Sequence, residues 1–183
     1  MSKSTDLGLL VLRLGFGAAA ASHGAQKLFG WFGGYGIEGT GGFFDSVGFS
    51  PGKRNATLAG LAEFGGGAAL ALGLATGPAG AAVAGNMAVA SSLHGFEKFF
   101  GQDGGPETAL TYGLVGTVFT LTGAGRYSLD QLTGNVLDKP WMRAVAFVSA
   151  AGAATAIIIA RRNELASRPA PVEVPAEGTD DAS

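Results

Sequence analysis

Residues 7–30 read LGLLVLRLGFGAAAASHGAQKLFG, and this stretch decides the fold class. A helix needs about 20 mostly apolar residues to cross the hydrocarbon core of a bilayer, and the stretch meets that length. Arg13 nevertheless interrupts its first part, and its last part carries His23, Gln26 and Lys27. Ionisable groups inside a span are expensive and usually face other helices or a polar cavity. The stretch therefore predicts a retained membrane helix that contributes polar groups to a site.

The composition of the whole chain also indicates a membrane protein. Charged residues make up 14% of the 183 residues, compared with about 25% in typical soluble proteins. The 32 glycines would let membrane helices approach closely. The absence of cysteine excludes disulfides, thiolate metal sites and a cysteine-based redox relay. With 12 Lys and Arg residues and a net charge of −2, the chain has no electrostatic footprint for nucleic acid.

Apolar windows of spanning length predict an all-α integral membrane protein. Four close-set helices would form a transmembrane bundle, and an additional fifth transmembrane helix would follow at the C-terminal side. Small residues at helix-face spacing in the second and third windows favour tight packing. The windows are 7–30, 55–76, 78–100, 107–124 and 142–160.

This pattern divides the chain into three parts. Residues 1–132 are expected to form the four-helix membrane domain, and residues 133–162 the linker and the fifth membrane helix. Residues 163–183 are rich in proline and acidic groups and contain no aromatic residue, so we expect a disordered polar tail.

Counting residues from the start of each span places polar residues of the first three spans at a similar depth in the membrane. His23 and His94 each lie about sixteen residues into parallel spans, and Glu63 of the antiparallel second span falls within a turn or two of that level. Lys27 follows His23 by one helical turn on the same face, with Gln26 beside it. We therefore expect a ligand-binding site near one membrane surface. Its residues would be His23, Gln26, Lys27, Glu63 and His94.

Several ligands fit this set of side chains. An imidazole that exchanges a proton near neutral pH, beside an ionised carboxylate, suits a quinone headgroup or another small polar molecule. Two histidines could also ligate a haem, but their position close to the surface and the lack of any further haem pattern disfavour it. His23, His94 and Glu63 are a known type of metal ligand set, yet nothing else supports a metal, and none is predicted. A purely structural polar layer, with Lys27 extending to the headgroups, is the remaining alternative.

Five motifs follow one another along the chain. They are LRLGFG (12–17), HGAQKLFGWFGGYGIEGT (23–40), GLAEFGGGAALALGL (60–74), HGFEKFFGQDGGPETAL (94–110) and GAGRYSLD (123–130). In this order and spacing the chain resembles the DoxX family of small bacterial and archaeal membrane proteins over about residues 7–132. The resemblance implies a four-helix membrane bundle in the cell membrane, and a link to membrane redox assemblies such as a thiosulfate:quinone oxidoreductase. Arg126 and Asp130 in the last motif are expected to cap the end of the fourth span.

Together, the residues and the resemblance predict a multi-pass membrane protein that is one subunit of a quinone-linked redox assembly rather than a complete enzyme. No catalytic residue is assigned. Its expected partners are the lipid bilayer and a protein of the redox complex, and a homo-oligomer is left open. The alternative is a non-catalytic scaffold or small-molecule carrier whose acidic tail recruits a partner protein. The distribution of Lys and Arg next to the spans weakly favours an N-terminus outside the cell, whereas the resemblance implies an N-terminus inside.

Overall fold

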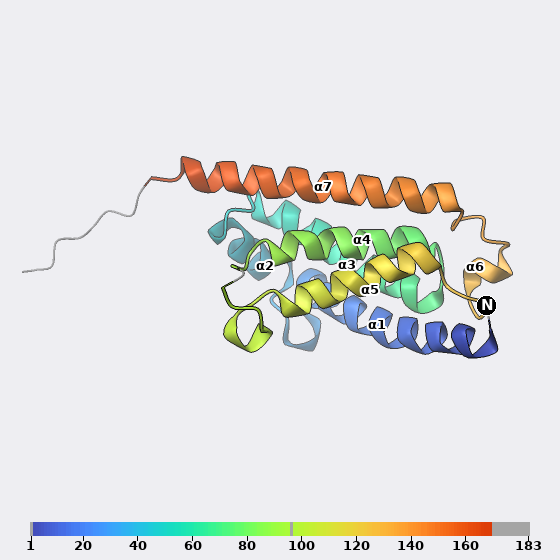
Figure 1. The fold of residues 1–183 in the computed structure, drawn as a ribbon. Coiled ribbons are helices and arrows are strands. Elements are labelled where there is room, and N and C mark those ends of the chain that lie inside the picture. Colours follow the sequence, from blue (N-terminus) through green and yellow to red (C-terminus); the bar gives the residue numbers. More distant parts are fainter. Residues whose placement is uncertain (1, 96, 170–183) are drawn as a thin grey trace, which may run out of the picture.

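The computed structural model describes residues 2–95 and 97–169, and all regular secondary structure in these ranges is helical. The long helices lie side by side, and the shorter helices lie at the ends of the assembly (Figure 1). The elements are α1 (Lys3–Phe29), α2 (Gly36–Ser46), α3 (Gly52–Leu72), α4 (Thr76–Ser91), α5 (Glu107–Thr122), α6 (Leu129–Leu132) and α7 (Pro140–Ser167), with short 3-10 segments at Trp31–Gly33 and Gly101–Asp103.

Local signals in the sequence fix both ends of α1. The hydroxyl of Ser2 accepts the backbone N–H of Thr5 at 3.2 Å, so it caps the first turn of the helix. At the other end Gly30 adopts φ 72°, a left-handed conformation that glycine takes without steric cost. The 27 residues between these caps form one of the two longest helices of the described chain.

Helices α1 and α3 are antiparallel and meet along glycines. A Cβ atom at Gly17 would lie 2.6 Å from backbone atoms of Gly67 and Ala71. A Cβ at Gly67 would in turn lie 2.6 Å from the carbonyl oxygen of Gly17. These glycines therefore allow a backbone approach that any side chain would prevent. The predicted tight packing of the small residues in the second window is confirmed for this face.

Buried polar side chains tie the connections between helices together. Arg13 is 2% exposed, and its Nη1 donates to the carbonyl oxygen of Ala71 at 2.8 Å, near the end of α3. The carboxylate of Asp130 accepts the N–H groups of Ala75 and Thr76 at 2.7 and 2.9 Å. Asp130 thus caps the start of α4, so the prediction that it caps the end of the fourth span is wrong.

Helix α7 lies at one edge of the bundle (Figure 1) and packs mainly on α4. A Cβ at Gly85 of α4 would lie 3.0 Å from the Cβ of Ala150, so small residues let the two helices approach. Near the C-terminal end of α7, Arg161 donates to the carbonyl oxygens of Val47 and Ser92 at 2.8 and 3.0 Å. Helix α7 is therefore held by packing along α4 and by the hydrogen bonds of Arg161 near the C-terminal end of α7.

The all-α prediction is confirmed, but the number of membrane spans stays a prediction. Among the described residues, α1 and α7 are long and apolar enough to cross a membrane. Helices α4 and α5 have 16 residues each. At 1.5 Å per residue such a helix is about 24 Å long, less than the ~30 Å of the hydrocarbon core.

Two predicted boundaries are wrong. The helix predicted for the third window is α4, and it ends at Ser91 instead of continuing to residue 100. The hydroxyls of Ser91 and Ser92 donate to carbonyls of the last turn, and Gly95 follows. The last helix continues to Ser167, past the predicted limit at 162, and a Glu164–Arg168 ion pair at 3.5 Å lies at its end. The remainder of the predicted tail, residues 170–183, lies outside the described residues.

Candidate functional site

The carboxylate of Glu63 is buried in the middle of α3 and has a donor for each oxygen. Glu63 is 3% exposed. Its Oε2 lies 2.5 Å from Nζ of Lys27 on α1, and its Oε1 accepts Nδ2 of Asn86 on α4 at 2.9 Å. Three helices therefore meet at a single carboxylate.

The glycine pattern of α1 and α3 explains how Lys27 reaches this carboxylate. Gly60 lies one turn before Glu63, and a Cβ there would lie 2.6 Å from Cγ of Leu28 and 3.4 Å from Cβ of Lys27. Because Gly60 has no side chain, the last turn of α1 lies directly against α3. The residue of α1 that contacts Glu63 is thus Lys27, one turn beyond His23, which was predicted at the level of Glu63.

The Lys27–Glu63 pair is electrically neutral but leaves hydrogen-bonding capacity unused. An ammonium carries three N–H donors and a side-chain amide two, and Glu63 accepts one from each. The Lys27 side chain is 25% exposed, against 4% for that of Glu63. Lys27 and Asn86 can therefore donate to a further acceptor while the carboxylate stays paired.

These three residues form the polar part of an otherwise apolar cavity of about 620 Å³. Its walls come from α3, α4 and α7, and the phenylalanines of and after α2 close one end. The remaining polar side chains in the lining are Asn55 of α3 and Ser149 of α7. The aromatic ones are Phe43, Phe44 and Phe49. An apolar pocket of this size with a few converging polar groups is the usual form of a small-molecule site.

The structure separates the other predicted site residues from this cavity. His23 is exposed; its ring lies edge-on to Tyr112, with centroids 5.7 Å apart, and its Nδ1 lies 3.2 Å from Oε1 of Gln26. Gln26 also donates to the carbonyl oxygen of Phe32 at 3.3 Å. His94 lies beyond the end of α4, where Nδ1 donates to the carbonyl of Gly104 at 2.7 Å. Among the described residues, the lining of the cavity includes none of His23, Gln26 and His94, so the five predicted residues do not form one site.

The residues predicted from the sequence to form the site do not include Asn86 or the wall contributed by α7. Asn86 donates a hydrogen bond from α4 to the central carboxylate on α3. The small residues of the last span, Ala150 and Ala154, were a usable signal, because a face without bulky side chains leaves room beside its neighbour. Within residues 2–95 and 97–169 no cluster of three or more His, Asp or Glu residues is arranged to hold a metal.

The described chain is all-helical, with two candidate membrane helices and a cavity beside a paired carboxylate. Residues 8–95 match the DoxX family model, and this match supports the resemblance of the chain to DoxX membrane proteins. The match covers α1 to α4, whereas α5, α6 and α7 lie beyond it. No curated protein and no solved structure matches the chain.

Proposed function

We propose that this protein is a membrane subunit of a redox assembly and that its cavity binds the headgroup of a quinone. The observation that carries the proposal is the buried Glu63 carboxylate, held by Lys27 and Asn86 at the wall of an apolar cavity of about 620 Å³. A quinone ring is apolar apart from two carbonyl oxygens, and both oxygens need hydrogen-bond donors.

The remaining N–H donors of Lys27 and Asn86 supply this chemistry. Both side chains line the cavity, and both donate to Glu63 through only one N–H. A ring carbonyl that accepts from the Lys27 ammonium would form a charge-assisted hydrogen bond, which is about twice as strong as a neutral one. The carboxylate orients both donors, so Glu63 is a positioning residue in this proposal.

The role as a subunit follows from the composition. The chain contains no cysteine, so electrons would reach the quinone from another protein rather than from a dithiol of this chain. The family resemblance to membrane redox assemblies supports the same role. Lys27, Glu63 and Asn86 replace the wider set of five residues as the ligand-binding group.

Quinone binding to purified protein in nanodiscs tests the proposal. Lys27→Met is expected to raise the Kd for a short-chain quinone at least about tenfold, since a hydrogen bond from a charged group contributes about 1.5–3 kcal/mol. Asn86→Leu removes a neutral donor, which contributes about 0.5–1.5 kcal/mol, and is expected to raise the Kd about two- to tenfold. Lys53→Met is the matched control, because Lys53 is exposed on α3 and pairs with the exposed Glu38. His23→Ala and His94→Ala are expected to leave the Kd unchanged.

Unchanged affinity in folded Lys27→Met and Asn86→Leu proteins would contradict the proposal. Loss of affinity in His23→Ala instead would move the site to the exposed face of α1. If the wild-type protein binds no quinone and retains only lipid, the scaffold or carrier function becomes the better account.

A further inference from the structure

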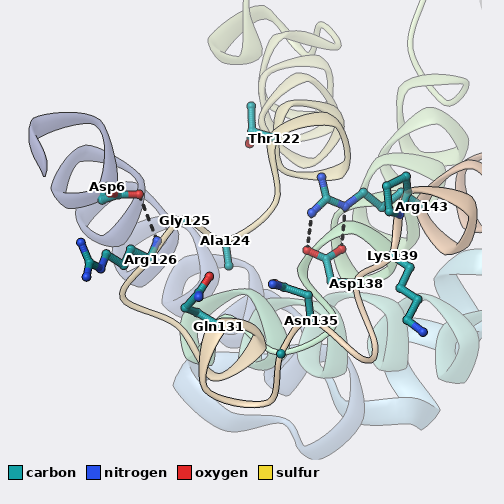
Figure 2. Close-up of a pocket in the computed structure, with 12 residues that line it drawn as sticks. Asp6, Thr122, Ala124, Gly125, Arg126, Gln131, Asn135, Asp138, Lys139 and Arg143 are labelled. Carbon is teal, nitrogen blue, oxygen red and sulfur yellow. Dashed lines mark hydrogen bonds and ion pairs between the residues drawn. The ribbon is translucent and has the colours of Figure 1, made fainter. Parts of the chain in front are cut away.

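A second cavity, of about 630 Å³, lies at the opposite end of the bundle from α2 and is mostly polar (Figure 2). It is formed by the first turns of α1 and α7, the last turn of α5, and the connection between α5 and α7. The Glu63 site makes no use of it.

Both candidate membrane helices begin beside this pocket. Asp6 belongs to the first turns of α1, and Pro140 to the start of α7. These are the two helices of the described chain that are long and apolar enough to span a bilayer, and both begin at the pocket. Trp141, in the first turn of α7, is 62% exposed, as expected for an aromatic side chain at the headgroup level.

The charged side chains of the pocket favour an anion. Three cations line it, Arg126, Lys139 and Arg143, together with the two carboxylates Asp6 and Asp138. Arg143 is committed to Asp138, with its Nε and Nη2 2.9 and 2.7 Å from the two carboxylate oxygens. Asp6 accepts the backbone N–H of Arg126 at 3.0 Å. The net charge of the lining is positive.

Two of these cations have no side-chain partner among the described residues. Arg126 and Lys139 are exposed, and neither side chain has a hydrogen bond or an ion pair within the part of the chain that the structure describes. Figure 2 shows them at opposite edges of the pocket, with the side-chain amides of Gln131 and Asn135 between them. Cations at two edges with amides between them are a donor set for a phosphate group.

We propose that this pocket binds the phosphate-bearing headgroup of an anionic membrane lipid. Arg126 and Lys139 attract the phosphate from the two edges, and Gln131 and Asn135 donate to its oxygens or to the hydroxyls of the headgroup. Basic pockets between membrane helices at the bilayer surface are recurrent sites for anionic lipids. The site is independent of the quinone cavity and of the function proposed for it.

Lipid retention by the full chain tests this proposal. The protein is reconstituted with phosphatidylglycerol and phosphatidylcholine, and bound lipid is counted by native mass spectrometry. Arg126→Gln combined with Lys139→Gln is expected to weaken phosphatidylglycerol retention about fivefold for each cation removed. The matched control is the double variant Arg54→Gln with Arg162→Gln, which removes two exposed arginines at the other end of the bundle. It is expected to retain as much phosphatidylglycerol as the wild-type protein.

Three results would overturn the proposal. The first is wild-type retention by the Arg126 and Lys139 double variant, whose thermal unfolding shows whether it is folded. The second is equal retention of phosphatidylcholine, which would remove the role of charge. The third is displacement of the lipid by inorganic phosphate, which would make the pocket a site for a soluble phosphate compound.

Discussion

At the scale of single residues, the central feature is the charge pair between Lys27 of α1 and the buried Glu63 of α3. Neither Lys27 nor Glu63 would be stable alone, since an unpaired charge in a low-dielectric environment loses its hydration without compensation. Asn86 completes the arrangement by donating to the second oxygen of Glu63. The sequence predicted both residues as members of one site, because the antiparallel order of two spans fixes the relative depth of their residues. It did not predict that the two side chains pair. The role of Asn86 at this site was not predicted either, since amides in membrane helices form hydrogen bonds in many contexts.

The pair predicts a non-additive effect on stability. Glu63→Leu leaves the Lys27 ammonium without its acceptor and is expected to lower the free energy of unfolding by about 3 kcal/mol. Lys27→Met combined with Glu63→Leu removes both charges and is expected to recover most of that loss. Unfolding of the purified protein in mixed detergent micelles, followed by circular dichroism, measures the cycle. Additive losses in the double variant would show that the two side chains are not coupled.

At the scale of elements, glycines determine which helix faces meet. Gly15 and Gly17 lie two residues apart on α1, but only Gly17 faces α3. A Cβ at Gly15 has no neighbouring atom within 4 Å, whereas one at Gly17 would lie 2.6 Å from backbone atoms of α3. The same residue type therefore has opposite structural roles at the two positions.

Alanine substitutions at these two glycines are expected to have opposite signs. Gly17→Ala forces α1 and α3 apart and should destabilise the protein by about 1–3 kcal/mol. Gly15→Ala meets open space and should stabilise α1 by up to about 1 kcal/mol, because alanine has the higher helix propensity. Thermal unfolding of the two variants in the same detergent measures both effects. Equal shifts of the two Tm values would contradict the close approach of α1 and α3.

The boundaries of elements were predictable where caps or abrupt changes of polarity mark them. The end of α1 coincides with Gly30, next to a cluster of aromatic and glycine residues. The end of α4 was missed because Leu93, Phe99 and Phe100 continue the apolar composition beyond the helix. Both phenylalanines are exposed, so hydropathy alone could not distinguish this connection from a span. The cap of α4 by Asp130 depends on tertiary contacts between distant segments, which no local pattern encodes.

At the scale of the whole molecule, the cavity beside Glu63 depends on a helix outside the matched family region. The match ends at residue 95, while Ser149, Ala150 and Ala153 of α7 form one wall of the cavity. The matched region therefore contains Lys27, Glu63 and Asn86 but not α7, which encloses the space beside them. The two proposed sites also lie in different parts of the bundle, so each can be altered separately.

Photolabelling with a photoreactive quinone tests the central claim most directly. The label is activated in nanodiscs containing the wild-type protein, and labelled peptides are mapped by mass spectrometry with and without an excess of unlabelled quinone. We predict labelling of peptides from α3, α4 and α7 around Glu63, Asn86 and Ala150, suppressed by the unlabelled quinone and diminished in Asn86→Leu. Labelling confined to the outer faces of α1 and α5, or labelling that the competitor does not suppress, would contradict a quinone site in this cavity.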